Sequence, residues 1–166
     1  MQPRHDKTFR YDTSLEWQSR RRATAMLEAA PPLALAPPRD FGGEPGRWAP
    51  EQLLLSAVES CTLFTFLAEA ARQNLELVSW GSSAEGTVTR DRDGRFSFTS
   101  VVVRPVVEVK TDDDALTARA LLQTVGRHCF IGNSLKAEPR IEGRVVVGGF
   151  AREPATPEPA VEGPSS

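Results

Sequence analysis

Residues 48–74 read WAPEQLLLSAVESCTLFTFLAEAARQN, and this stretch decides the fold. Pro50 suits the first turn of a helix, because a backbone N–H at that position would lack a helical partner in any case. Glu51 lies in the same turn, where its negative charge complements the helix dipole. Apolar residues then cover most of the circumference as far as about Asn74. The pattern predicts a long helix that is buried at the centre of the fold.

The chain before this helix predicts a small β-structure. Residues 8–18 alternate apolar and polar side chains, as a half-buried strand does. Residues 23–27 and 33–36 read as two more short strands, punctuated by proline pairs. Residues 40–46 (DFGGEPG) are rich in turn formers and predict a loop before the helix.

The chain after the helix predicts a hairpin, a second helix and a last strand. Residues 91–94 (DRDG) are a turn sequence. Thr111 and the aspartates after it predict a helix cap. The expected elements are strands at 75–90 and 95–110, a helix at about 115–128, a short turn or helix at 130–136 and a strand at 139–147. This order predicts an α+β fold with an antiparallel sheet rather than a regular βαβ alternation.

Length and composition favour one folded domain. A chain of 166 residues suits one hydrophobic core, so we expect a single domain over residues 1–150. Residues 151–166 are rich in proline and glutamate and have little to bury, so we expect a disordered tail there. The net charge of −2 argues against a nucleic-acid partner.

Two features favour a cytoplasmic protein without a membrane segment. The first ten residues are polar and lack the apolar run of a signal peptide. Residues 53–67 form the longest apolar stretch, but Glu59 and Ser60 interrupt it, and we expect it to be too short to span a bilayer.

The two cysteines, Cys61 and Cys129, are the candidates for chemistry. A structural disulfide is not expected in a reducing compartment. The histidines, His5 and His128, do not form a metal-ligand spacing with them, so we expect no metal and no cofactor. Two alternatives remain open at this point, namely two inert buried thiols or a redox pair.

Cys61 lies in the middle of the predicted helix, ten residues after Glu51. Ten residues of helix rise about 15 Å, so the two side chains cannot touch along one straight helix. If they work together, a second subunit or a return of the chain must bring them close. The dipole of the helix decays within one turn and cannot activate this thiol. A thiol among apolar side chains needs a nearby cation to react.

Four arginines are candidates for that cation: Arg20, Arg22, Arg39 and Arg47. Arg39 lies in the loop before the helix, where its guanidinium could hold the Cys61 thiolate on one side and Glu51 on the other. The alternative interpretation makes Cys61 a small core residue and leaves Arg39 and Glu51 as surface charges.

Cys129 is expected to close the second helix. The C-terminus of a helix disfavours a thiolate, so Cys129 is the poorer nucleophile and suits a second thiol that attacks an oxidised Cys61. His128 precedes it, but neighbours in a helix point about 100° apart, so a dyad of Cys129 with His128 is not expected.

Three segments resemble the OsmC/Ohr family of osmotically inducible and organic hydroperoxide resistance proteins. Residues 48–54 (WAPEQLL), followed by Ser60-Cys61, resemble that family's N/T-P-E-x-L…(A)-C segment, with the same spacing from Glu to Cys. Residues 128–135 (HCFIGNSL) resemble its second-cysteine segment, although Gly132 stands where serine is usual. Residues 37–43 (PPRDFGG) resemble the loop before its helix, and the likeness covers about residues 17–147.

The resemblance implies an OsmC-like fold, with antiparallel sheets wrapped around a long central helix in an intertwined homodimer. It implies a cysteine-based hydroperoxide reductase with its sites at the dimer interface. Cys61 would be the peroxidatic thiolate, Cys129 the resolving thiol and Glu51 the partner of the arginine. That arginine is Arg39 in the OsmC-like arrangement, or comes from the first hairpin in the Ohr-like arrangement, which would select Arg20 or Arg22.

The expected function is reduction of organic hydroperoxides through a Cys61 sulfenic acid and a Cys61–Cys129 disulfide. A dithiol, of the lipoyl type or another, would regenerate the thiols. Apolar side chains expected near Cys61, from Phe41, Trp48 and Phe64, favour an organic peroxide. The alternatives are a non-catalytic OsmC-like dimer that senses redox state or binds a small ligand, and a structural dimer with inert thiols.

Overall fold

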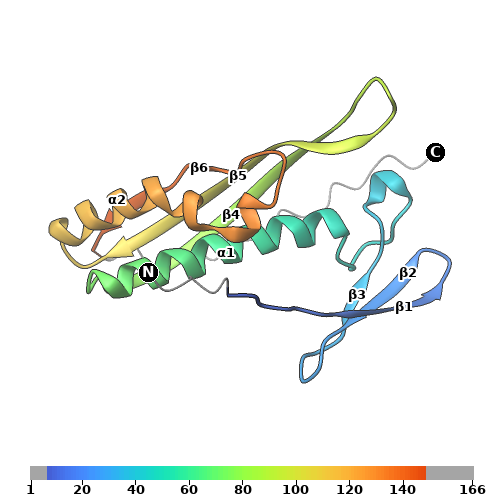
Figure 1. Ribbon diagram of the computed structural model, residues 1–166, viewed down its shortest axis with the longest axis horizontal. Helices are drawn as coiled ribbons and strands as arrows, with labels where there is room; N and C mark the ends of the chain where they lie inside the picture. Colours follow the sequence, from blue (N-terminus) through green and yellow to red (C-terminus); the bar gives the residue numbers. More distant parts are fainter. Residues whose placement is uncertain (1–6, 149–166) are drawn as a thin grey trace, which may run out of the picture.

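The structure, a computed structural model, describes residues 7–148, and the expected tail at residues 151–166 lies outside the described residues. The elements follow the predicted order along the chain (Figure 1). They are β1 (Ser14–Ser19), β2 (Arg22–Met26), β3 (Leu33–Leu35), the 3-10 turn η1 (Arg39–Phe41), α1 (Pro50–Arg72), β4 (Leu77–Arg90), β5 (Phe96–Val109), α2 (Asp112–His128), α3 (Phe130–Asn133), β6 (Arg140–Ile141) and β7 (Arg144–Val147).

The predicted α+β class is confirmed, but one edge of the main sheet differs from the antiparallel expectation. The long strands β4 and β5 pair antiparallel, as the turn at residues 91–94 predicted. The expected last strand divides into β6 and β7, and both pair parallel to β5. The reason is that α2 carries the chain back along the sheet, so the next strand runs in the direction of β5.

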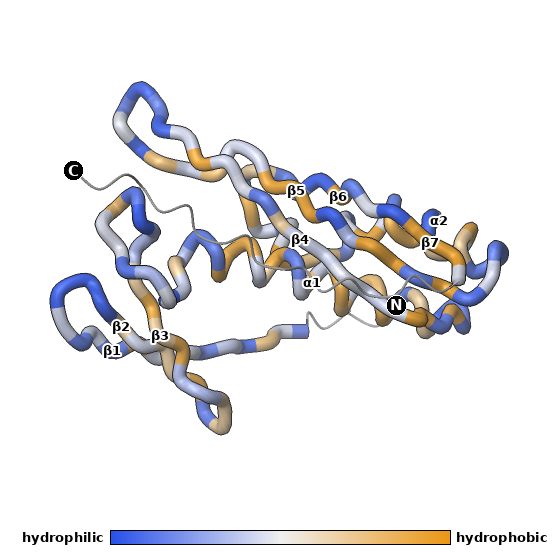
Figure 2. Tube along the Cα trace, turned by 180° about the vertical axis from the view of Figure 1, so that it is seen from behind, coloured by the Kyte–Doolittle hydropathy of each residue, from blue (hydrophilic) through white to orange (hydrophobic). Residues whose placement is uncertain are grey.

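Helix α1 begins at Pro50, as predicted, and its start is closed by the Gln52 side chain. The backbone N–H of Ala49 donates to Gln52 Oε1 at 3.0 Å. The cap of α2 is also confirmed, since the Asp114 N–H donates to Thr111 Oγ1 at 3.1 Å. Both helices lie against the sheet of β4 and β5 (Figures 1 and 2).

The main core lies between α1, α2 and the sheet. Phe66 of α1 is fully buried and packs against Trp80 of β4, with ring centroids 5.1 Å apart. Valines of β5, including Val107 and Val109, meet Leu121 and Val125 of α2 in the same cluster. This packing holds α1 against the sheet along its C-terminal half.

We expected the apolar stretch at residues 53–67 to be too short to cross a membrane, and this argument from length is wrong. The helix formed has 23 residues and is, by length and composition alone, long and apolar enough to cross one. In this structure α1 packs instead on the sheet, α2 and α3, as the core helix of a globular domain does.

The strands β1, β2 and β3 form a separate antiparallel sheet, which we call the N-terminal sheet. It stands apart from the main body and is joined to it through the loop before α1 (Figure 1). A bridge between Leu35 and Trp48 ties that loop back to β3. Every residue of β1 is exposed, including Leu15 at 63% and Trp17 at 74%. Within residues 7–148, no hydrophobic layer covers β1.

Helix α1 also keeps an apolar stripe in solvent. Its buried residues in the structure are Val58, Cys61, Thr62, Phe66 and Ala70. Phe64 and Leu67 are 66% and 41% exposed, and Ala68 continues the same helical face. An exposed apolar stripe of this kind marks a surface for association.

We expect a dimer in solution, because burial of these surfaces removes apolar area from water. Light scattering at micromolar concentration should give twice the mass of one chain. Leu67→Glu places a charge on the exposed stripe and should shift the mass toward one chain. Leu116→Glu is the matched control on α2, where a singly exposed leucine needs no partner. A folded, monodisperse single chain in the wild type would contradict the expectation.

Candidate active site

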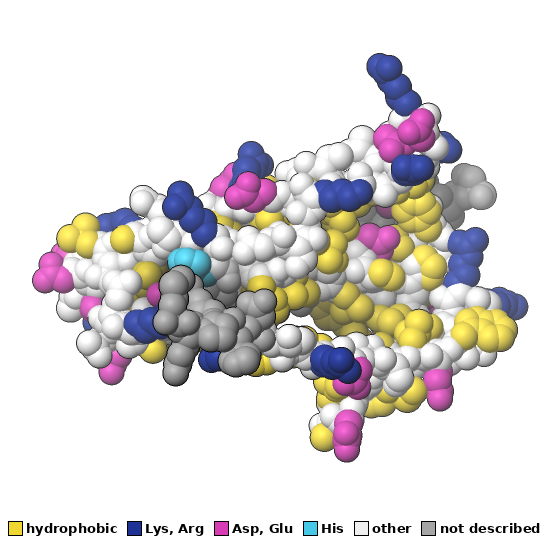
Figure 3. All heavy atoms as spheres, in the orientation of Figure 1, with side chains coloured by type: hydrophobic (Ala, Val, Ile, Leu, Met, Phe, Trp, Pro, Cys, Tyr) yellow, Lys and Arg dark blue, Asp and Glu magenta, His cyan; other side chains and the backbone are white. Residues whose placement is uncertain are grey.

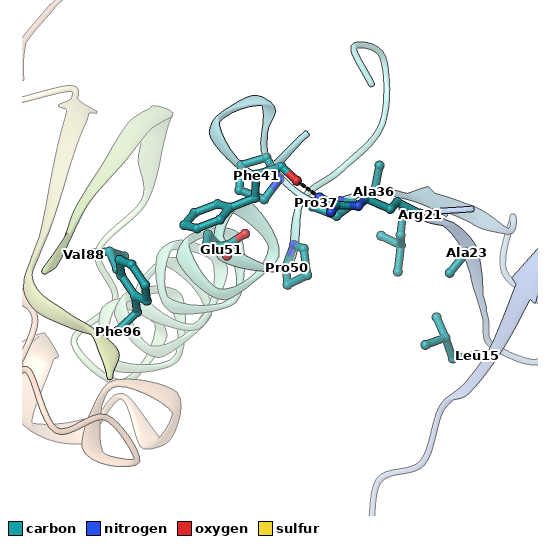
Figure 4. A pocket seen from close by; sticks show the side chains of 12 residues that line it. Leu15, Arg21, Ala23, Ala36, Pro37, Phe41, Pro50, Glu51, Val88 and Phe96 are labelled. Carbon is teal, nitrogen blue, oxygen red and sulfur yellow. Dashed lines mark hydrogen bonds between the residues drawn. The ribbon is translucent and has the colours of Figure 1, made fainter. Parts of the chain in front are cut away.

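A broad cleft separates the N-terminal sheet from the main body. Its volume is about 490 Å³, and hydrophobic side chains gather in the hollow (Figure 3). Leu15 and Ala23 face it from the N-terminal sheet, Arg21 from the turn between β1 and β2, and Val88 and Phe96 from the β4–β5 hairpin (Figure 4). The remaining lining residues are Leu35, Ala36, Pro37, Pro38, Phe41, Pro50 and Glu51. We call this the Glu51 cleft.

Among the described residues that line the Glu51 cleft, the charged side chains are Arg21 and Glu51. One carboxylate oxygen of Glu51, Oε2, is buried and has no hydrogen-bond partner among the described residues. Arg21 donates through its guanidinium to the carbonyl oxygen of Phe41, drawn as a dashed line in Figure 4. A buried carboxylate oxygen without a donor is costly. The carboxylate is therefore positioned to accept a hydrogen bond from a group that enters the cleft.

The structure does not bring the predicted arginines to Glu51. Arg39 is exposed at the start of η1 and does not line the cleft. Arg22 is held by Glu44 through two hydrogen bonds of 2.7 and 2.8 Å, and the pKa of Glu44 is lowered by that pairing. Arg20 sits at the hairpin turn with a positive φ of 47° and lies outside the cleft lining.

Arg21 is the residue that sequence reasoning missed. Leu15 of β1, Ala23 of β2 and Arg21 line the Glu51 cleft together. Arg21 lies in the turn between β1 and β2, next to Arg20 with its positive φ, so strand alternation does not fix its direction. The sequence therefore held no local signal for choosing the middle arginine of the three.

The structure brings Cys61 and Cys129 together as free thiols. They are 7% and 2% exposed, Cys61 on α1 and Cys129 at the junction of α2 and α3. Burial raises the pKa of the Cys129 thiol, and a hydrogen bond with Cys61 raises it further. The Thr62 hydroxyl and the Gly132 N–H act in the opposite direction. The pairing needed for a redox couple is thus present within one chain.

Cys129 has a second structural role that the sequence did not indicate. It ends α2 and also caps α3, because its Sγ accepts a hydrogen bond from the Gly132 N–H at 3.3 Å. Gly132 is buried, and a Cβ at that position would lie 3.4 Å from the sulfur and 3.3 Å from Pro139. A side chain at position 132 would therefore crowd Cys129 and Pro139, and glycine permits this close packing.

A second, smaller cleft of about 360 Å³ opens beside Cys61. It is lined by Cys61, Phe64, Thr65, Ala68, Glu69, His128 and Phe130, and we call it the Cys61 cleft. It shares no lining residue with the Glu51 cleft. The separation agrees with the rise of about 15 Å over ten helical residues. Within one chain, Glu51 and Arg21 do not reach the cysteines.

The raised pKa of Cys129 predicts a pH dependence of stability. A thiol whose pKa is higher in the folded chain stabilises the fold fully below the ordinary thiol value of about 8.5. That contribution is lost as the pH rises through the folded value, because the unfolded chain releases the proton more easily. From about pH 7 to pH 10, the wild type should therefore lose more free energy of unfolding than Cys129→Ser. Urea denaturation under reducing conditions measures both, and parallel losses would contradict the assignment.

Known proteins are similar to this chain in sequence or in structure. The uncharacterized protein YmaD of Bacillus subtilis is 26% identical over 139 residues, covering 80% of this chain and 92% of that protein. An OsmC-like protein of unknown function from Vibrio cholerae superimposes with a TM-score of 0.72 at 19% identity, over 84% of this chain and 100% of that one. An organic hydroperoxide resistance protein from Elizabethkingia anophelis gives a TM-score of 0.66 at 13% identity, over 86% and 100%.

A family model described as OsmC-like protein matches residues 42–143. That range holds α1 with Glu51 and Cys61, the β4–β5 hairpin, and the α2–α3 junction with Cys129. The chain belongs to the OsmC-like family, as the three sequence segments indicated.

Proposed function

We propose that this protein is a thiol-dependent peroxidase that reduces organic hydroperoxides, with Cys61 as the peroxidatic residue and Cys129 as the resolving residue. The observation that carries the proposal is the pair of buried free thiols beside an apolar cleft. Phe64, Ala68 and Phe130 line that cleft and offer a surface to the organic part of a hydroperoxide. One solved relative named as an organic hydroperoxide resistance protein shares the fold and supports the same class of substrate.

The first step is attack of the Cys61 thiolate on the distal oxygen of the hydroperoxide. A sulfur–oxygen bond forms, the oxygen–oxygen bond breaks, and the electron pair leaves on an alkoxide that is protonated to the alcohol. Cys61 becomes a sulfenic acid. Cys129 then attacks that sulfur, water leaves, and a disulfide joins the two residues. An external dithiol, of the lipoyl type or another, reduces the disulfide to two thiols.

The two cysteines suit different roles because their surroundings differ. The raised pKa of Cys129 keeps it protonated and slow to attack a peroxide. Its sulfur faces Cys61 and is oriented by the Gly132 N–H, so it is well placed for the second step. Cys61 lines the cleft, whereas Cys129 does not, so an entering peroxide meets Cys61 first.

A homodimer would complete the site. Arg21 and Glu51 lie in one cleft and Cys61 in another, so a second copy is the source of a guanidinium for the thiolate. The unpartnered oxygen of Glu51 supports this arrangement, because it can orient the arginine once the two chains meet. The proposal includes a cytoplasmic location, where a dithiol reductant is available.

Replacement of each cysteine separates their roles. Cys61→Ser should abolish consumption of cumene hydroperoxide with a dithiol, because no nucleophile remains at the cleft. Cys129→Ser should consume one equivalent and stop as a sulfenic acid at Cys61, detectable by dimedone labelling and mass spectrometry. Loss of the first turnover in Cys129→Ser would reverse the two roles. A wild type that forms the disulfide once without further turnover would indicate a redox sensor rather than an enzyme.

Replacement of each arginine identifies the cation. Arg21→Ala should slow alkylation of Cys61 by iodoacetamide at neutral pH about tenfold or more, because one nearby positive charge favours a thiolate by roughly 1–3 pK units. Arg39→Ala is the matched control, since Arg39 is exposed and lies outside the cleft. Arg21→Lys should rescue poorly, because an ammonium lacks the planar fork. If Arg39→Ala is slow and Arg21→Ala reacts like wild type, the loop arginine is the partner.

A further inference from the structure

The Cys61 cleft contains a histidine that the mechanism above does not use. Among the described residues that line the cleft, His128 is the basic one. It is the last residue of α2, directly before Cys129. Cys129 is buried toward Cys61 and Thr62, while His128 is exposed and lines the cleft. The two neighbours therefore approach Cys61 from different sides, one in the interior and one at the cleft.

His128 occupies the last turn of α2 and lines the Cys61 cleft. The titratable groups that face it in the cleft are Cys61 and Glu69 of α1, and α3 contributes the uncharged Phe130. Glu69 is paired with Arg72 at 2.6 Å, which leaves the thiol as the group with a proton to exchange.

The reaction at Cys61 requires a group that exchanges protons at two steps. The thiol must lose a proton before it attacks, and the alkoxide that leaves must gain one. A guanidinium stabilises charge but does not exchange protons near neutral pH, so Arg21 cannot serve. The thiol of Cys129 holds its proton more tightly because its pKa is raised. An imidazole exchanges protons in the neutral range and suits both transfers.

We propose that His128 is the general base and general acid of the Cys61 reaction. It takes the proton of the Cys61 thiol, and the thiolate attacks the distal oxygen of the hydroperoxide. The sulfur–oxygen bond forms as the oxygen–oxygen bond breaks. The proton on His128 then passes to the leaving alkoxide, which departs as the alcohol and leaves neutral imidazole beside a sulfenic acid. The role of His128 as general acid rests on the proposed peroxidase function. Its role as general base concerns the Cys61 thiol alone.

The test uses His128→Ala in the full-length protein, with Arg127→Ala as the matched control. Arg127 is the preceding exposed residue of α2 and lies outside the Cys61 cleft. His128→Ala should consume cumene hydroperoxide roughly 100-fold more slowly at neutral pH, near the lower end of the range for general acid–base catalysis. Added imidazole should restore at least part of the rate, because it can replace the missing side chain as a proton carrier. Arg127→Ala should match wild type and should not respond to imidazole.

A second readout is the rate of Cys61 alkylation by iodoacetamide as a function of pH, measured in a Cys129→Ser background. His128→Ala should move the midpoint of this profile to higher pH. A wild-type rate in His128→Ala, or a slow rate with no imidazole rescue and an unchanged alkylation profile, would overturn the proposal. If the wild type consumes no peroxide, the proposed function fails, and the alkylation profile alone decides whether His128 accepts the Cys61 proton.

Discussion

The rigid rise of α1 is the constraint on which the rest of the site depends. Glu51 and Cys61 lie on one helix that runs without a break from Pro50 to Arg72. Its geometry keeps the acid and the thiol about 15 Å apart and places them in separate clefts. A polar group that belongs beside the thiol must therefore come from a distant segment of the chain or from another copy. This separation explains why Arg21, the α2–α3 junction and the exposed surfaces matter to the site.

Burial of the thiol pair follows from the way α1 packs. Val58 and Thr62 lie on the same inner face as Cys61, and Val58 packs in a cluster with Val101 and Val103 of β5. The α2–α3 junction then brings Cys129 onto that face and orients it through its own cap. Burial protects both thiols and raises the pKa of Cys129. A reaction at Cys61 thus needs charge and proton exchange delivered at the cleft, and Arg21 and His128 are the side chains that could deliver them.

The same helix leaves part of its apolar surface uncovered. The β4–β5 sheet covers one side of α1, so the stripe with Phe64 and Leu67 on another side faces solvent. The apolar residues of β1 are also exposed to solvent. The length and composition of α1 would suit a membrane, yet its packed side holds the core of the domain. In the proposed dimer, association of two chains would cover the stripe and supply the arginine in the same event. Stability and assembly of the site would then depend on one surface.

The sequence by itself determined the elements whose signals are local. Pro50 and the apolar run predicted α1, Thr111 predicted the cap of α2, and the turn at residues 91–94 predicted the β4–β5 hairpin, since each pattern lies within a few residues. Only the tertiary structure decided which side chains meet. The parallel pairing of β6 and β7, the presence of Arg21 rather than Arg39 in the lining of the Glu51 cleft, and the placement of His128 at the Cys61 cleft all depend on how distant segments pack, which no short stretch of sequence encodes.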